Sequence, residues 1–145
     1  MPAANKIVFK VADCPMLEMP NGKFRDSFLV TDRTGRGKGL SAGLVWFAPH
    51  NDEGHPDVHS FDEVFYIIDG RGRFVADGAE HAVETGDVVY CPAGMVHTYL
   101  TDDSHLQLFW CITSAWESME ESLLTEIAET WLEVDPRSGW HVPAG

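Results

Sequence analysis

Two segments of the sequence place imidazole and carboxylate groups at short, fixed spacings. In the segment HSFDE, His59 and Glu63 are separated by three residues, and His97 follows in the segment GDVVYCPAGMVHTYL. Imidazole and carboxylate groups are ligands that divalent transition metals accept in proteins. Ligands on different strands of a small barrel can converge in its interior, because alternate residues of each strand point inward. The three residues therefore predict one metal site.

The elements that would position these residues are short strands. From Leu40 to Thr113, extended runs rich in Val, Ile, Phe, Tyr and Trp alternate with turn residues, a pattern typical of an antiparallel sandwich or barrel. The runs are SAGLVWF, EVFYII, GRFVA, DVVY, VHTYL and LQLFWCI. The breaks between them are DGRG (69–72), DGAE (77–80), TG (85–86) and CPAG (91–94), and the Asp-Gly breaks predict tight hairpins.

Alternation along the strand that begins at Glu63 predicts which side chains point inward. If Glu63 faces the interior, Phe65 and Ile67 face it too. The opposite face carries Val64, Tyr66 and Ile68, which are also apolar. The strand therefore needs cover on both faces, from a second sheet or a second subunit. By the same alternation, Tyr99 shares the face of His97.

The flanking segments have a different character. Residues 1–39 are irregular, with an edge strand expected at Ile7–Val11, an extended run at Phe24–Thr31 and a loop at 31–39. Over residues 115–133 apolar residues recur every three or four positions between glutamates, which predicts an amphipathic helix that begins after an N-cap at Ser114. We divide the single expected domain into an N-terminal segment (1–39), a barrel (40–113) and a C-terminal helix and tail (114–145).

Composition excludes several function classes. The 145-residue chain has a formal net charge of −13, which disfavours binding to nucleic acid or to anionic membranes. No apolar stretch approaches the about 20 residues of a membrane helix, and no signal peptide is recognisable, so we expect a cytoplasmic protein. The cysteines Cys14, Cys91 and Cys111 are widely spaced, so neither a disulfide framework nor a structural zinc site is expected.

The spacing of these residues resembles the two motifs of the cupin superfamily. The first motif, G-x5-H-x-H-x3/4-E-x6-G, is matched by D-x-H-x3-E-x6-G from Asp57 to Gly70. The second, G-x5-P-x-G-x2-H-x3-N, is matched at Gly86, Pro92, Gly94 and His97, with Thr101 in place of Asn. The resemblance implies an all-β fold, the double-stranded β-helix or jelly-roll barrel of cupins, here with a C-terminal α-helix. It also implies a divalent metal ion held by His59, Glu63 and His97.

The chain departs from the motif at Asp57, which occupies the position of the first histidine. Asp57 could be a fourth ligand, could orient a ligand or a water molecule, or could be a plain surface residue. Two histidines and one carboxylate favour iron or manganese, with zinc or nickel as alternatives. For two further residues the sequence leaves more than one role open. His55 could lie at the barrel mouth or ligate the metal, and Tyr99 could contact a substrate or fill the barrel.

Other residues have weaker claims to a role in the site. One of the neighbours Trp46 and Phe47 should line the pocket. The remaining histidines match no ligand position and are expected to be structural or exposed; they are His50, His81, His105 and His141.

The resemblance leaves the reaction open. Cupins include oxygenases, isomerases, lyases, decarboxylases and plain binding domains, so the fold alone does not fix the function. We expect a metal-dependent enzyme that acts on a small organic substrate, with an oxygenase favoured because two histidines and one carboxylate leave adjacent coordination positions open. A non-redox enzyme in which Glu63 or Asp57 acts as general base is the nearest alternative, and a non-catalytic ligand-binding module is the other. The resemblance also implies a homodimer.

Overall fold

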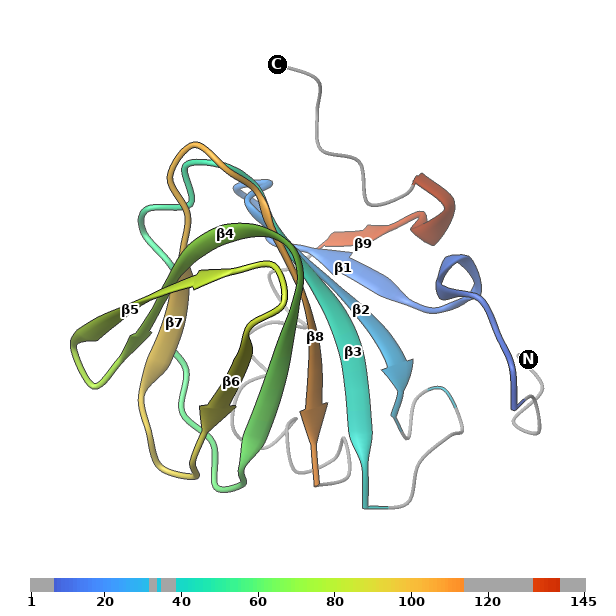
Figure 1. Cartoon of the computed structure of the whole chain (residues 1–145). Helices are drawn as coiled ribbons and strands as arrows, with labels where there is room; N and C mark the ends of the chain where they lie inside the picture. Colours follow the sequence, from blue (N-terminus) through green and yellow to red (C-terminus); the bar gives the residue numbers. More distant parts are fainter. Residues whose placement is uncertain (1–6, 32–33, 35–38, 114–131, 139–145) are drawn as a thin grey trace.

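The computed structural model describes residues 7–31, 34, 39–113 and 132–138 of the chain. Within these ranges the regular secondary structure is almost entirely antiparallel β-sheet (Figure 1). The strands are β1 (Met16–Glu18), β2 (Phe24–Val30), β3 (Ser41–Phe47), β4 (Glu63–Ala76), β5 (Ala79–Glu84), β6 (Val88–Cys91), β7 (His97–Leu100), β8 (Leu106–Ile112) and β9 (Leu132–Val134). Two short 3-10 helices, η1 (Val11–Asp13) and η4 (Pro136–Ser138), flank them. The described residues contain no helix long and apolar enough to cross a membrane.

Strand β4 belongs to both halves of the barrel. Its first half pairs with β6 on one side and β8 on the other, and the sheet continues from β8 through β3, β2 and β1 to β9. Its second half, from Arg71, pairs with β5 and β7. Figure 1 shows β4 curving from one sheet into the other. This arrangement confirms the predicted all-β barrel.

The break predicted at DGRG (69–72) is wrong, because β4 runs without interruption through it. The strand bends there by two devices: a register shift against β8 between Ile67 and Asp69, and Gly70 at a φ of 90°. A Cβ at Gly70 would collide with the carbonyl group of His105, and one at Gly72 would lie 2.6 Å from the carbonyl oxygen of Leu100. The two glycines therefore allow the β7–β8 connection to pass close against β4. The DGRG segment is a bend within this strand and does not form a hairpin turn.

The other predicted turns are present. Asp77 and Gly78 both have positive φ angles, 48° and 81°, as a two-residue hairpin between twisted strands requires. Gly86 and Gly94 also have positive φ, between β5 and β6 and between β6 and β7. These short connections determine the register of the strands that carry the candidate site.

The extended run predicted at Phe24–Thr31 is confirmed by β2, whereas the other two predicted flanking elements differ from the structure. The edge strand expected at Ile7–Val11 is absent; Val11–Asp13 forms η1, and the short strand before β2 is Met16–Glu18 instead. The expected helix over 115–133 lies outside the described residues up to residue 131, but Leu132 and Glu133 belong to β9, which pairs with β1. The free edge of β1 presents unpaired backbone groups with which a further strand can pair. The spacing of apolar residues along 115–133 gives no information about this pairing.

The core lies between the two sheets and follows the predicted alternation. Phe65 and Ile67 of β4 are buried, whereas Val64, Tyr66 and Ile68 on the opposite face are 44%, 48% and 40% exposed. Aromatic rings fill the centre: the ring centroids of Phe65, Phe74 and Tyr99 lie 5.0 to 6.1 Å apart. The interior is therefore packed with apolar side chains, and the polar residues of the site lie among them.

Candidate metal centre

The loop that carries Asp57 and His59 is tied to β7 by its backbone. Asp57 and His97 exchange two hydrogen bonds of 2.8 Å each, from each N–H to the other's carbonyl oxygen. The Gly94 N–H donates to the carbonyl oxygen of His59, also at 2.8 Å. These bonds join the loop before β4 to the turn between β6 and β7. They place the two sequence motifs against each other.

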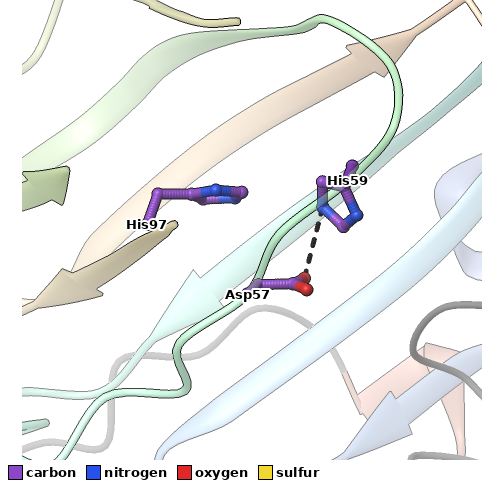
Figure 2. A group of neighbouring side chains, drawn as sticks. All are labelled: Asp57, His59 and His97. Atoms are coloured by element: carbon purple, nitrogen blue, oxygen red, sulfur yellow. Dashed lines mark ion pairs between the residues drawn. The ribbon is translucent and has the colours of Figure 1, made fainter. Parts of the chain in front are cut away.

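The side chains of Asp57, His59 and His97 face a common space (Figure 2). One potential ligand atom from each lies within 4.8 Å of the others. Nε2 of His59 lies 3.2 Å from Oδ2 of Asp57 and 3.6 Å from Oε1 of Glu63. The same oxygen of Glu63 lies 3.5 Å from Nε2 of His97. The structure thus brings together the three predicted ligands His59, Glu63 and His97, and with them Asp57, whose role the sequence left open.

Hydrogen bonding fixes the orientation of one imidazole. Nδ1 of His97 lies 3.0 Å from the carbonyl oxygen of Met95, so this nitrogen carries the proton and donates. Nε2 then faces Glu63, and when it carries no proton its lone pair is directed into the site, as in metal-binding histidines whose other nitrogen is held by a backbone carbonyl. The ring of His59 stacks on Phe61 at 4.8 Å, and its Nδ1 has no hydrogen-bond partner among the described residues.

Burial dominates the electrostatics of the cluster. It raises the pKa of the Asp57 carboxyl to about 7, outweighing attraction to His97 and the hydrogen bond from the Val58 N–H. It also lowers the pKa of His59 to about 4, helped by the neighbouring His97. Burial likewise raises the pKa of Glu63. For His97, burial is outweighed by the hydrogen bonds to Glu63 and Met95, so its pKa is raised.

The donor set fits a divalent cation. His59, Glu63 and His97 are between 5% and 7% exposed, and within the described residues no lysine or arginine forms an ion pair with either carboxylate. Buried carboxylates are costly unless a positive charge compensates them. A metal ion between these donors would supply that charge, and the low pKa of His59 keeps its imidazole in the neutral form that ligates.

Comparisons with known proteins agree with this architecture. Residues 43–112 match the family model described as a cupin domain. This segment is a cupin domain. A comparison with curated protein sequences finds no match.

Several solved structures share the fold of this cupin. An RmlC-like cupin from Shewanella frigidimarina is 19% identical, with a TM-score of 0.64 over 79% of this chain and 96% of the other. The polyketide cyclase RemF from Streptomyces resistomycificus is 16% identical, with a TM-score of 0.63 over 74% of this chain and 78% of the other. The EutQ protein of Clostridium difficile is 18% identical, with a TM-score of 0.57 over 69% and 68%. Identities this low establish the fold of the cupin and not its activity.

The other predicted site residues of the cupin lie in different surroundings. Tyr99 is 4% exposed, packs against Phe47 at 5.5 Å, and its hydroxyl has no hydrogen-bond partner among the described residues. Phe47 belongs to the interior cluster, whereas Trp46 lies on the opposite face of β3 with Arg25 over its ring. His55 is partly buried and is not a member of the metal-binding group.

The histidines outside the two motifs take no part in the cluster where the structure describes them. Nε2 of His105 lies 2.7 Å from Asp69, Nε2 of His50 lies 4.0 Å from Asp103, and His81 is exposed. His141 lies outside the described residues.

Two contacts of the site were not predicted from the sequence. Besides the Met95 carbonyl, Sγ of Cys91 lies 3.4 Å from Nδ1 of His97. The signal for both was present, because Cys91 and Met95 stand at either end of the turn that His97 follows. Only the folded turn shows that Sγ of Cys91 and the carbonyl group of Met95 both lie beside the imidazole of His97.

Proposed function

We propose that this cupin binds a divalent transition metal through His59, Glu63 and His97, with Asp57 as a fourth donor, and that it is an enzyme acting on a small organic substrate. The observation that carries the proposal is the convergence of two imidazoles and two carboxylates in one cluster, with no lysine or arginine in contact with either carboxylate among the described residues. Two histidines and a carboxylate on one face favour iron or manganese, and the second carboxylate favours these harder ions over zinc.

We infer an oxygenase as the first reaction class. A bound metal would supply Lewis acidity and adjacent positions for substrate oxygen atoms and dioxygen. The chain's own residues would shape the surroundings of these positions. His97, held by the Met95 carbonyl, keeps its Nε2 lone pair toward the site, and the apolar rings of Phe65 and Phe74 beside it exclude water. Tyr99, on the same face as His97, has a buried hydroxyl without a hydrogen-bond partner among the described residues, and this hydroxyl would bond to a substrate that reaches it.

The test combines metal analysis with oxygen uptake. We expect about one metal ion per chain in the purified protein and oxygen consumption by the ferrous form with at least one member of a panel of phenols, diketones and hydroxy acids. The variant Glu63→Gln should lose the metal, whereas Glu53→Gln, which changes an exposed carboxylate, should keep it. Absence of metal from a correctly folded protein would refute the proposal. Bound metal without turnover of any substrate would leave a binding module.

A non-redox isomerase or lyase is the second candidate, and one observation favours it. The pKa of Asp57, raised to about 7, suits a general base that works near neutral pH. Asp57→Asn separates the two candidates. Loss of turnover with metal retained indicates a base, and loss of metal indicates a ligand. Turnover under anaerobic conditions would exclude the oxygenase.

We also propose a homodimer built on the outer face of the barrel. Val64 lies opposite Tyr90 across the β4–β6 ladder, and Tyr66 lies opposite Val88. All four are exposed, by 44% to 67%, so the face is apolar but uncovered in the single chain. Contiguous exposed apolar residues of this kind mark association surfaces. Analytical ultracentrifugation at micromolar concentration should find a dimer, and a monomer would refute this assignment.

A further inference from the structure

A second carboxyl group lies on the interior face of strand β2. Asp26 lies on β2 between Phe24, which packs against the core, and Phe28, which is 3% exposed within it. Strand alternation puts these three side chains on the interior face, while Arg25 and Ser27 point the other way. An acidic residue in an otherwise apolar row is costly, so its position calls for a partner or a role.

The structure holds this carboxyl group in a defined orientation. Nε1 of Trp110 on β8 donates a hydrogen bond of 2.9 Å to Oδ1 of Asp26, although β3 lies between the two strands. The indole reaches across because Gly43, its partner on β3, has no side chain: a Cβ there would lie 2.5 Å from the Trp110 ring. Gly43, Trp110 and Asp26 therefore act together to orient one carboxyl group inward.

One oxygen of Asp26 remains available. Trp110 offers a single N–H, and among the described residues Oδ2 has no hydrogen-bond partner. Asp26 also keeps part of its surface accessible, unlike Phe28 beside it. Burial raises the pKa of the carboxyl well above its usual value, against the effect of the Trp110 hydrogen bond, and the charge of Glu63 raises it further. The protonated form is thereby favoured, and its proton belongs on Oδ2, since Oδ1 accepts from Trp110.

We propose that Asp26 is a second anchor for the substrate of the metal centre, donating a hydrogen bond from Oδ2 to a carbonyl or other acceptor oxygen of that substrate. The inference rests on the proposed metal-dependent function and adds the substrate class: a molecule with one oxygen-bearing end at the metal and an acceptor oxygen at its other end. The apolar side chains around Asp26 leave few other donors for such an oxygen, so the contact would select for it.

The test uses the full chain loaded with cobalt(II), whose visible spectrum reports coordination of an added ligand. The probes are alkyl hydroxamic acids with a methyl ketone at the end of tails of increasing length, each paired with the hydroxamic acid that has a methylene in place of the carbonyl. At the tail length that spans the two anchors, the ketone should bind about threefold to tenfold more tightly than its pair, as expected for one net hydrogen bond.

Four variants assign the preference to Asp26. Asp26→Asn keeps a donor and an acceptor, and should retain the preference for the ketone. Asp26→Leu and Asp26→Ala remove the donor and should abolish the preference for the ketone over its methylene pair; two variants are used in case one fails to fold. Ser27→Ala alters the next residue of β2 on the opposite face and should behave as the wild type. In nitrogen-15 NMR spectra, the indole N–H of Trp110 should shift with the ketone and not with its pair.

The outcomes separate the two proposals. If cobalt or the hydroxamates do not bind, the metal centre itself is refuted, and the anchor falls with it. If they bind but no tail length favours the ketone, only the anchor is refuted. A preference that survives in Asp26→Leu and Asp26→Ala assigns the contact to another residue and also overturns the inference. Loss of the preference in Asp26→Asn would overturn the neutral donor.

Discussion

Each face of strand β4 departs from the usual distribution of polar and apolar side chains at one end. The inner face begins with the buried carboxylate Glu63, in contact with His59 and His97, and the outer face presents Val64 and Tyr66 to solvent. Each face carries a cost that the single chain does not relieve: an uncompensated buried charge on one, exposed apolar area on the other. The difference indicates two kinds of missing partner, a cation inside and a protein surface outside.

The largest effect is expected from a change on the inner face. Glu63→Gln keeps the shape of the side chain and removes its charge, so metal affinity should fall by more than about 100-fold, beyond the loss typical of residues that only support a ligand. Isothermal titration of the metal-free protein measures it. Val64→Ala, on the outer face of the same strand, is the matched control. Equal metal affinity in Glu63→Gln and the wild type would remove Glu63 from the site.

A charge on the outer face should act on association and not on metal binding. Tyr66→Lys places an ammonium group in the apolar face, and we expect dimer dissociation to become easier by about tenfold or more, as for the loss of a central interface residue. Sedimentation velocity over a concentration series measures the change. Val8→Lys, at a residue that is 87% exposed elsewhere on the chain, is the control. If both variants dissociate alike, the outer face of β4 is not the interface.

The inner face also predicts a pH dependence for the metal-free protein. The folded-state pKa of Asp57 is raised from 3.8 to about 7, so the folded protein binds the extra proton and stability falls as pH rises through that window. The pKa of His59 is lowered from 6.5 to about 4, so its contribution is present above pH 6.5 and is lost as pH falls toward 4. The two contributions oppose each other between about pH 4 and 6.5.

In the variant Asp57→Asn, the pH dependence of stability should reflect His59 without the opposing contribution of Asp57. At pH 8 the metal-free variant should be more stable than the wild type by about 1–3 kcal/mol, because it buries no charged carboxylate at this position. On acidification below pH 6.5 it should lose stability more steeply than the wild type. Urea unfolding of chelator-treated protein at several pH values measures both effects. Parallel pH profiles for the two proteins would contradict the assignment.

The smallest effect on stability is expected at Tyr99. Its hydroxyl has no partner among the described residues, so Tyr99→Phe should change the free energy of unfolding by less than about 1 kcal/mol. If the hydroxyl contacts substrate, turnover should nevertheless fall by about tenfold or more. Urea unfolding and steady-state kinetics separate the two quantities. Unchanged turnover would leave Tyr99 a residue that only fills the barrel.

The sequence by itself indicated the strands between Ser41 and Ile112 and the inward set Glu63, Phe65 and Ile67. It also singled out His59, Glu63 and His97 as one site and left the role of Asp57 open. Period-two alternation and motif spacing are local properties, so they can be read without the fold. The sequence misplaced the break at DGRG, because Asp-Gly signals a turn whereas Gly70 here accommodates the close passage of His105. It also could not show that Leu132–Val134 pairs with β1, since pairing depends on a distant strand.

Tertiary structure alone decided how the polar groups meet. Asp57 and His97 are far apart in the chain, and only their paired backbones bring the side chains to one space. The orientation of His97 depends on the Met95 carbonyl. The orientation of the Asp26 carboxyl depends on the indole of Trp110, two strands away, which reaches it across Gly43. Such contacts join residues by register and close approach, which depend on the packing of the whole barrel. Local sequence specifies which groups are present, and the barrel specifies which of them touch.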